Sequence, residues 1–93
     1  MEEKFLDALE AGRQEAAGLG VRLRPTPREK LLDMTHRALS GSRESDGFWA
    51  LEKLHRLDLT PEALAVDKRF TALFTDEEAD AALTRLLDAG YRF

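Results

Sequence analysis

Arg24, Thr26 and Arg28 are the residues of this chain whose types and spacing most suggest binding chemistry. Thr26, Pro27 and Glu29 together predict the start of a helix, with Thr26 as the cap, Pro27 in the first helical position and Glu29 completing a capping box. The first N–H groups of a helix attract anions, and guanidinium groups bind phosphate through paired hydrogen bonds. The set therefore predicts an anion site. The alternative is a solvated helix start in which Glu29 already completes the cap.

Residues with the spacing of a catalytic or metal site are scarce. His36 and His55 lie 19 residues apart without a cysteine or a second histidine at ligand spacing, so a zinc site is not expected. Ser40, Ser42 and Ser45 lie in or beside a loop and lack the glycine-flanked turn of a hydrolase nucleophile. No glycine-rich phosphate loop is present. We therefore expect no catalytic residue, no metal and no cofactor.

Composition limits the class of protein. The 93 residues predict one domain with a thin core. Because there is no cysteine, disulfides are excluded and a reducing, cytoplasmic location is expected. No apolar run is long enough to span a bilayer, and the acidic, amphipathic N-terminus does not resemble a signal peptide. The net charge of −4 disfavours a nucleic-acid partner without excluding one.

Three segments have the periodicity of helices. Residues 2–17 carry an apolar face that ends before Gly18 and Gly20, and a second helix is expected from Thr26 to about Ser40. The last helix begins at Thr75 or Asp76, where acids in the first turn suit the helix dipole, and it ends at Gly90. Its expected buried stripe consists of Ala79, Ala82, Leu83, Leu86 and Leu87.

Other segments alternate as strands do. Val21–Arg24 and Arg69–Phe74 place apolar side chains at every second position, and residues 91–93 form a short terminal strand. Phe48–Leu59 fits a strand or a helix. The competing interpretation of residues 60–74 is a helix that Thr60 and Pro61 begin.

After the first helix, the elements follow the order strand, helix, strand, strand, helix, strand. This order resembles the βαββαβ pattern of the ferredoxin-like fold. We therefore predict an α+β domain in which residues 1–20 form an added helix and residues 21–93 form an antiparallel sheet backed by two helices. The alternative is an all-α domain of four or five helices.

In the predicted sheet, arginines gather on the open face. Arg22 and Arg24 lie opposite the inward Val21 and Leu23, and Arg69 and Arg92 have the same parity. The candidate anion- or partner-binding residues are Arg22, Arg24, Thr26, Arg28, Arg69 and Arg92. The RNA-recognition motif family has the same order of elements, but here Phe70 and Phe74 would face inward and could not stack on bases.

These observations favour a small non-catalytic binding or regulatory module that acts through protein contacts. We expect the partner to be another protein or a second copy of this chain, because the outer strand Phe48–Leu59 would leave an edge open to pairing. The alternative function is binding of a phosphate-bearing ligand or RNA through the arginines. No membrane partner is expected.

Overall fold

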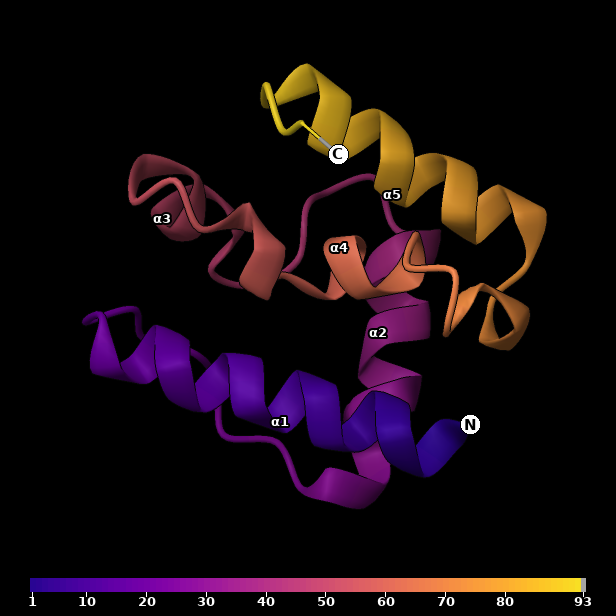
Figure 1. Cartoon of the computed structure of the whole chain (residues 1–93), viewed down its shortest axis with the longest axis horizontal. Coiled ribbons are helices and arrows are strands. Elements are labelled where there is room, and N and C mark those ends of the chain that lie inside the picture. Colours follow the sequence, from indigo (N-terminus) through magenta and orange to yellow (C-terminus); the bar gives the residue numbers. More distant parts are fainter. Residues whose placement is uncertain (93) are drawn as a thin grey trace.

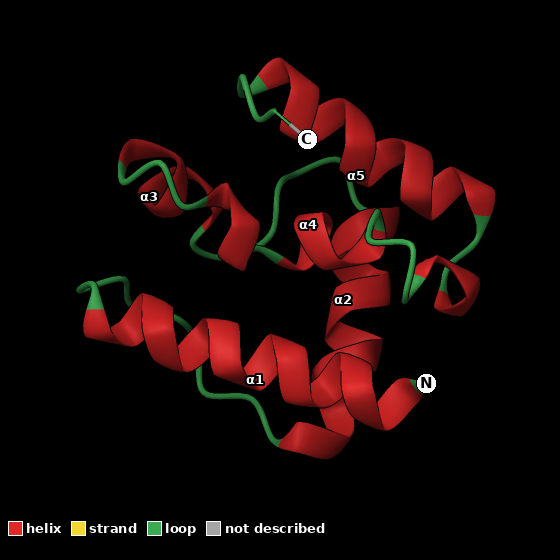
Figure 2. Ribbon diagram, in the orientation of Figure 1, coloured by secondary structure: helices red, strands yellow, loops and turns green. Residues whose placement is uncertain are grey.

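The computed structural model describes residues 1–92, and every regular element in that range is helical (Figure 2). The predicted ferredoxin-like α+β fold is therefore wrong, and the all-α alternative is confirmed. The α-helices are α1 (Glu2–Gly18), α2 (Leu31–Ser40), α3 (Phe48–Lys53), α4 (Pro61–Ala65) and α5 (Asp76–Asp88), and the 3₁₀ turns are η1 (Arg28–Lys30), η2 (Leu57–Leu59) and η3 (Thr71–Leu73).

The two longest helices lie on opposite sides of the molecule (Figure 1). The short α4 lies between α1 and α5 and packs against both, while α2 crosses behind and also contacts both long helices. Helix α3 occupies one end of the molecule, on the left in Figure 1. Helices of six and five residues are not stable alone, so α3 and α4 depend on this packing.

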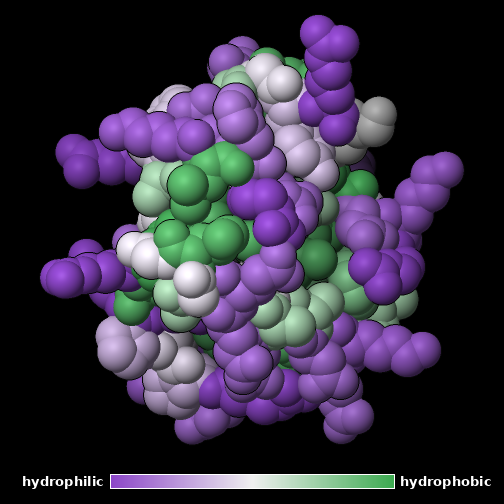
Figure 3. All heavy atoms as spheres, turned by 60° about the vertical axis from the view of Figure 1, so that its left-hand side comes forward, coloured by the Kyte–Doolittle hydropathy of each residue, from purple (hydrophilic) through white to green (hydrophobic). Residues whose placement is uncertain are grey.

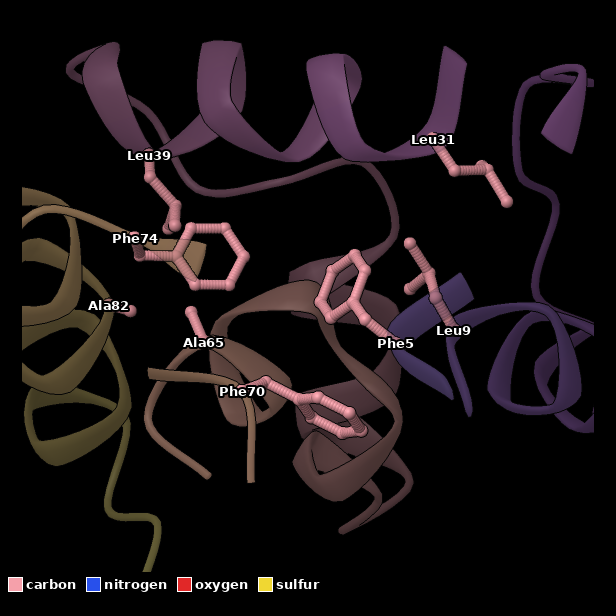
Figure 4. Packing of buried hydrophobic residues seen from close by; sticks show 8 residues of the cluster. All are labelled: Phe5, Leu9, Leu31, Leu39, Ala65, Phe70, Phe74 and Ala82. Atoms are coloured by element: carbon pink, nitrogen blue, oxygen red, sulfur yellow. The ribbon is translucent and has the colours of Figure 1, made fainter. Parts of the chain in front are cut away.

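A cluster of three phenylalanines holds the two sides together (Figure 4). Phe5 of α1 meets Phe70 edge-on at 5.6 Å between ring centroids, and it meets Phe74 at 5.5 Å. These edge-to-face arrangements are favourable for aromatic rings. The other buried members are Leu9, Leu31, Leu39, Ala65 and Ala82, so α1, α2, α4 and α5 all contribute.

Two smaller clusters fix α3. Leu51 packs with Ala16 of α1 and with Val21, and Phe48 packs with Leu57 and with Leu86 of α5. Successive turns of one short helix thus face two different parts of the core. The predicted outer strand over Phe48–Leu59 is therefore α3 followed by η2.

The alternation at Val21–Arg24 is real, but it does not arise from a sheet. Val21 is buried and Leu23 is half-buried against the Leu51 cluster, while Arg22 and Arg24 are exposed. This segment lies outside regular structure, because no second strand within residues 1–92 pairs with it.

The phenylalanines of Arg69–Phe74 follow a spacing of four rather than two. Phe70 and Phe74 are both buried, and η3 occupies the three residues between them. Ala72, which a strand would bury with them, is exposed. Within the competing helix over residues 60–74, only Pro61–Ala65 is α-helical. The expected terminal strand is also not seen, because Tyr91 and Arg92 are irregular and residue 93 lies outside the described residues.

Several helix ends follow the sequence signals. The Thr75 hydroxyl accepts from the N–H of Glu78, and the Glu78 carboxylate accepts from the N–H of Thr75, so the predicted cap of α5 is a full capping box. Thr60 caps α4. The expected capping box at Thr26 is wrong, because the Thr26 hydroxyl donates to the carbonyl of Arg24 instead.

Three helices end in the same hydrogen-bonded motif. After α1 and after α5, the residue in the left-handed conformation is a glycine, Gly20 or Gly90. After α3 it is His55, with φ of 58°, which is the one non-glycine residue with positive φ in the described chain. An L-residue is strained in this conformation, so α3 ends in a less relaxed geometry than α1 and α5.

Candidate functional site

The predicted arginine face does not form. Arg28 turns toward α1, where its guanidinium donates to Asp7 (2.8 Å) and to Glu10. These hydrogen bonds raise the pKa of Arg28 above its ordinary value, and the bond to Glu10 has the larger effect. The Arg28 charge is therefore matched by two carboxylates of α1, and anion binding at this residue stays a prediction.

The other predicted arginines lie on separate segments. Arg69 pairs with Asp67 at 2.9 Å, and its guanidinium lies 4.8 Å from the centre of the Phe70 ring. Hydrogen bonds from the side chain and backbone of Arg69 lower the pKa of Asp67. Arg22 and Arg92 are exposed and make no ion pair within residues 1–92. They do not line a common site with each other or with Arg69.

Arg24 and Thr26 do share a site. They line a surface hollow of about 520 Å³ together with Arg43, which the sequence did not single out. We call this hollow the arginine pocket. Its other lining residues are Met34, Ala38, Glu44, Ser45 and Asp46.

Hydrogen bonds tie the two loops that form the arginine pocket. The N–H of Arg24 donates to Oδ2 of Asp46 (2.9 Å), which joins the loop at 21–27 to the loop at 41–47. Arg13 of α1 donates to the carbonyl of Arg24 through one nitrogen, and its other nitrogen lies 3.9 Å from the sulfur of Met34. The backbone around Arg24 is thus held from two sides, while its own guanidinium has no partner among the described residues.

A buried ion pair fixes the inner wall of the arginine pocket. Glu62 of α4 is fully buried and accepts from the N–H (2.9 Å) and the hydroxyl (2.5 Å) of Ser45. Arg85 of α5 lies 3.3 Å from the same carboxylate and donates to the carbonyls of Ala38 (2.9 Å) and Gly41 (2.7 Å). The loop at 41–47 is therefore anchored to α4 and α5.

The pairing of arginines is uneven. Of the ten arginines, Arg28, Arg37, Arg56, Arg69 and Arg85 pair with carboxylates. Among the remaining five, Arg24 and Arg43 line the arginine pocket, and Arg13 bonds to two of its residues. Two guanidinium groups without a partner in residues 1–92, those of Arg24 and Arg43, therefore lie at this hollow, and the other two, those of Arg22 and Arg92, lie elsewhere.

A second surface comes from α5. Leu83 and Leu87, which the sequence pattern places in the core, are 37% and 55% exposed. Asp76 and Asp80 continue the same side of the helix toward its N-terminus, at steps of three and four residues. We call these four residues the acidic leucine face. Asp76 and Asp80 make no ion pair with any residue in the range 1–92, and neither do the exposed Glu77 and Asp88 on the same helix.

Other apolar side chains reach the surface at the end that carries α3. Leu19, Trp49 and Leu54 are exposed there. Figure 3, which turns this side toward the reader, shows apolar atoms at the surface between hydrophilic residues. Because these side chains do not share one helix face, they make a less regular surface than that of α5.

A histidine–carboxylate pair also forms, which the sequence pattern did not predict. Nδ1 of His36 lies 2.6 Å from Oε2 of Glu78, and the ring packs on Phe74 at 5.1 Å between centroids. Burial acts to raise the pKa of Glu78, but hydrogen bonds from the Thr75 backbone and from His36 outweigh it and lower that pKa. Within residues 1–92 no hydroxyl or thiol bonds to His36, so the pair lacks the nucleophile of a hydrolytic site.

Comparison with protein-family models, with curated proteins and with solved structures finds no match for this chain. No helix within residues 1–92 has the length and apolar character needed to cross a membrane. The function proposed for the chain therefore depends on its own surfaces.

Proposed function

We propose that this chain is a non-catalytic binding module that acts through contact with another protein, and that the acidic leucine face of α5 is the contact surface. One observation carries the proposal: Leu83 and Leu87 are exposed on a helix whose Asp76 and Asp80 have no ion-pair partner in the described chain. Apolar side chains at helical spacing with charges alongside are the pattern by which helices dock.

The charges favour a basic partner. The only cation on α5 is Arg85, which turns inward to Glu62, so nothing on the helix neutralises its exposed acids. A partner helix with lysines or arginines beside leucines would match both features, and complementary charge speeds encounter and excludes wrong partners. The proposed partner is therefore a basic amphipathic helix.

A second copy of the chain fits this face less well. Two acidic leucine faces placed against each other would bring Asp76 and Asp80 near like charges, which is unfavourable. The strand edge that suggested a homodimer is not present, so self-association now lacks its original reason. It stays a prediction, and sedimentation at micromolar concentration tests it. The proposed location remains the cytoplasm, as the absence of cysteine suggests.

Calorimetric titration with a designed peptide tests the proposal. The peptide is an amphipathic helix with leucines on one side and lysines beside them, and its control replaces each lysine with glutamate. We expect the basic peptide to bind and the acidic one not to bind. Replacing Leu83 and Leu87 with serine should weaken binding at least about tenfold, because about 1.4 kcal/mol of lost apolar burial corresponds to that factor.

The matched control is the double variant Leu19→Ser/Leu54→Ser, which removes two exposed leucines outside α5. It should bind the basic peptide as the wild type does. Equal binding of the two peptides, or equal losses in the two double variants, would contradict the proposal. If sedimentation instead finds a dimer that only Leu83→Ser/Leu87→Ser dissociates, the occupant of the face is a second copy.

A further inference from the structure

We infer that the arginine pocket is a binding site for a small phosphate ester that carries free hydroxyl groups. This site is separate from the acidic leucine face and would give the module a small-molecule ligand in addition to a protein partner.

The argument begins with unpaired charge. Acidic residues outnumber lysine and arginine by 18 to 14, yet the guanidinium groups of Arg24 and Arg43 meet no carboxylate within residues 1–92. A guanidinium presents its donors in a planar fork that fits phosphate oxygens two at a time. Two such groups lining one hollow can hold a phosphate group from two directions.

The remaining lining residues suit the rest of such a ligand. Met34 and Ala38 of α2 supply apolar contact, and Thr26 supplies a hydroxyl group. One oxygen of Asp46 is bonded to the N–H of Arg24, whereas Glu44 has no partner in the described chain and can accept from a hydroxyl group of the ligand. A volume of about 520 Å³ lies within the range of small-molecule sites.

The arginine pocket is also organised before a ligand binds. Asp46 joins its two loops, Glu62 holds Ser45, and Arg85 donates to the carbonyls of Ala38 at the end of α2 and of Gly41 at the start of the second loop. Binding therefore does not have to order these loops, and a site formed in advance loses less conformational entropy on binding.

Thermal melting in a calorimeter provides the test. The ligands are ribose 5-phosphate, glycerol 3-phosphate and adenosine monophosphate, with inorganic phosphate and ribose for comparison, all at matched ionic strength. We expect at least one ester to raise the melting temperature with a saturating dependence on concentration. Inorganic phosphate should have a smaller effect and ribose none. Failure of all three esters to give a saturating shift would overturn the inference.

Arginine variants locate the site. In Arg24→Ala/Arg43→Ala, affinity for the ester should fall on the order of 100-fold, because each charged hydrogen-bond set contributes about tenfold. Neither side chain has a partner in the described structure, so the variant should fold. Its melting temperature without ligand should equal that of the wild type. The matched control, Arg22→Ala/Arg92→Ala, removes two arginines that have no ion pair within residues 1–92 and lie elsewhere, and it should bind as the wild type does.

Equal loss of binding in both double variants would mean general charge attraction and would overturn the inference. So would stabilisation by an RNA oligonucleotide alone with a steep salt dependence. The variant Glu44→Ala removes the acceptor proposed for the ligand's hydroxyl groups. It should lose most of the preference for the ester without weakening the binding of inorganic phosphate, and an unchanged preference would contradict the role given to Glu44. Failure of the peptide titration on α5 would leave this result unaffected, because the two surfaces share no residue.

Discussion

At the scale of single residues, Glu78 shows how one carboxylate can serve two structures. Its Oε1 accepts from the N–H of Thr75 (2.9 Å) and closes the capping box, and its Oε2 lies 2.6 Å from His36 of α2. The capping role is local and was predictable from the Thr75–Glu78 spacing. The pairing with His36 was not, because 42 residues separate the partners and only the packing of α2 on α5 brings them together.

We predict that Glu78 makes stability depend on acid pH. Its pKa in the folded protein lies below the ordinary value of 4.5, so its contribution to the free energy of unfolding is present above that value. The contribution is lost as pH falls through the lowered pKa. Between about pH 5 and 3, the free energy of unfolding should therefore fall more steeply for the wild type than for Glu78→Gln. Urea denaturation across this range measures the slopes.

Glu77→Gln is the matched control for Glu78→Gln. Glu77 is the preceding residue on the same helix, but it is exposed and makes no ion pair in residues 1–92. Glu77→Gln should change the slope less than Glu78→Gln does, because Glu77 lacks the side-chain hydrogen bonds that Glu78 makes to Thr75 and His36. Both variants keep the Asp67–Arg69 pair, so its titration in acid affects them alike. A wild-type slope in Glu78→Gln would contradict the assigned role of Glu78.

At the scale of elements, Gly47 allows the segment at 21–24 to pack closely on the start of α3. Gly47 precedes the helix with φ of 80°, and a Cβ atom there would lie 2.4 Å from Cδ2 of Leu23 and 3.3 Å from Cγ1 of Val21. The segment at 21–24 therefore packs directly on the start of α3. This contact replaces the strand pairing that the alternating sequence suggested.

We predict that Gly47→Ala destabilises the protein more than Gly20→Ala does. Both glycines have positive φ, but a Cβ atom at Gly20 would meet nothing within 4 Å. Gly20→Ala should therefore cost only the backbone strain, about 1 kcal/mol, whereas Gly47→Ala adds displacement of Leu23 and should cost about 2 kcal/mol. Chemical denaturation followed by circular dichroism gives both values. Equal losses would show that Leu23 moves aside freely.

Sequence patterns predicted helices more reliably than strands in this chain. The helices expected at 2–17 and after Thr75 are present, because each has its own apolar face and end signals. The helix expected from Thr26 to about Ser40 is present only from Leu31, because the start signal at Thr26 does not form a cap. The segments expected as strands have alternating or ambiguous patterns of apolar residues. A short irregular segment that packs one side on the core has the same pattern as a strand. The local sequence does not distinguish a strand from such an irregular segment, because a strand forms only where a partner strand pairs with it.

The candidate sites were predictable only in part, because they also depend on contacts between segments that are distant in sequence. Arg24 and Thr26 were predicted as binding residues, but for a helix start that does not form there. Arg43 joins them only because the loop at 41–47 is bonded to the loop at 21–27 through Asp46 and Arg24. The exposure of Leu83 and Leu87 also could not be predicted, because it depends on which side of α5 is packed: Ala82 and Leu86 are buried, whereas Leu83 and Leu87 are not.

At the scale of the whole molecule, the Glu62–Arg85 pair joins segments that are distant in sequence. It links α4, α5, the end of α2 and the loop at 41–47 through hydrogen bonds, and the described chain leaves no buried side-chain polar atom unpaired. Removing one member of a buried pair leaves the other charge without compensation. The pair is therefore more important to stability than an exposed pair with similar geometry.

We predict that Glu62→Ala lowers the free energy of unfolding by about 3 kcal/mol. The matched control is Asp33→Ala, which removes the partner of Arg37 in a pair whose side chains are 66% and 82% exposed. That change should cost less than about 0.5 kcal/mol. Thermal and chemical denaturation of both variants provide the comparison, and similar losses would show that the buried pair has no special role.

The single tryptophan of the chain lies on six-residue α3, half-exposed, with its ring edge-on to buried Phe48 at 5.1 Å. Its intrinsic fluorescence therefore reports on one end of the molecule alone. The far-ultraviolet signal comes mainly from α1 and α5, which lie on opposite sides. A difference between the two melting curves would show that the end bearing α3 opens before the rest, and coincident curves would show that all five helices unfold as one cooperative unit.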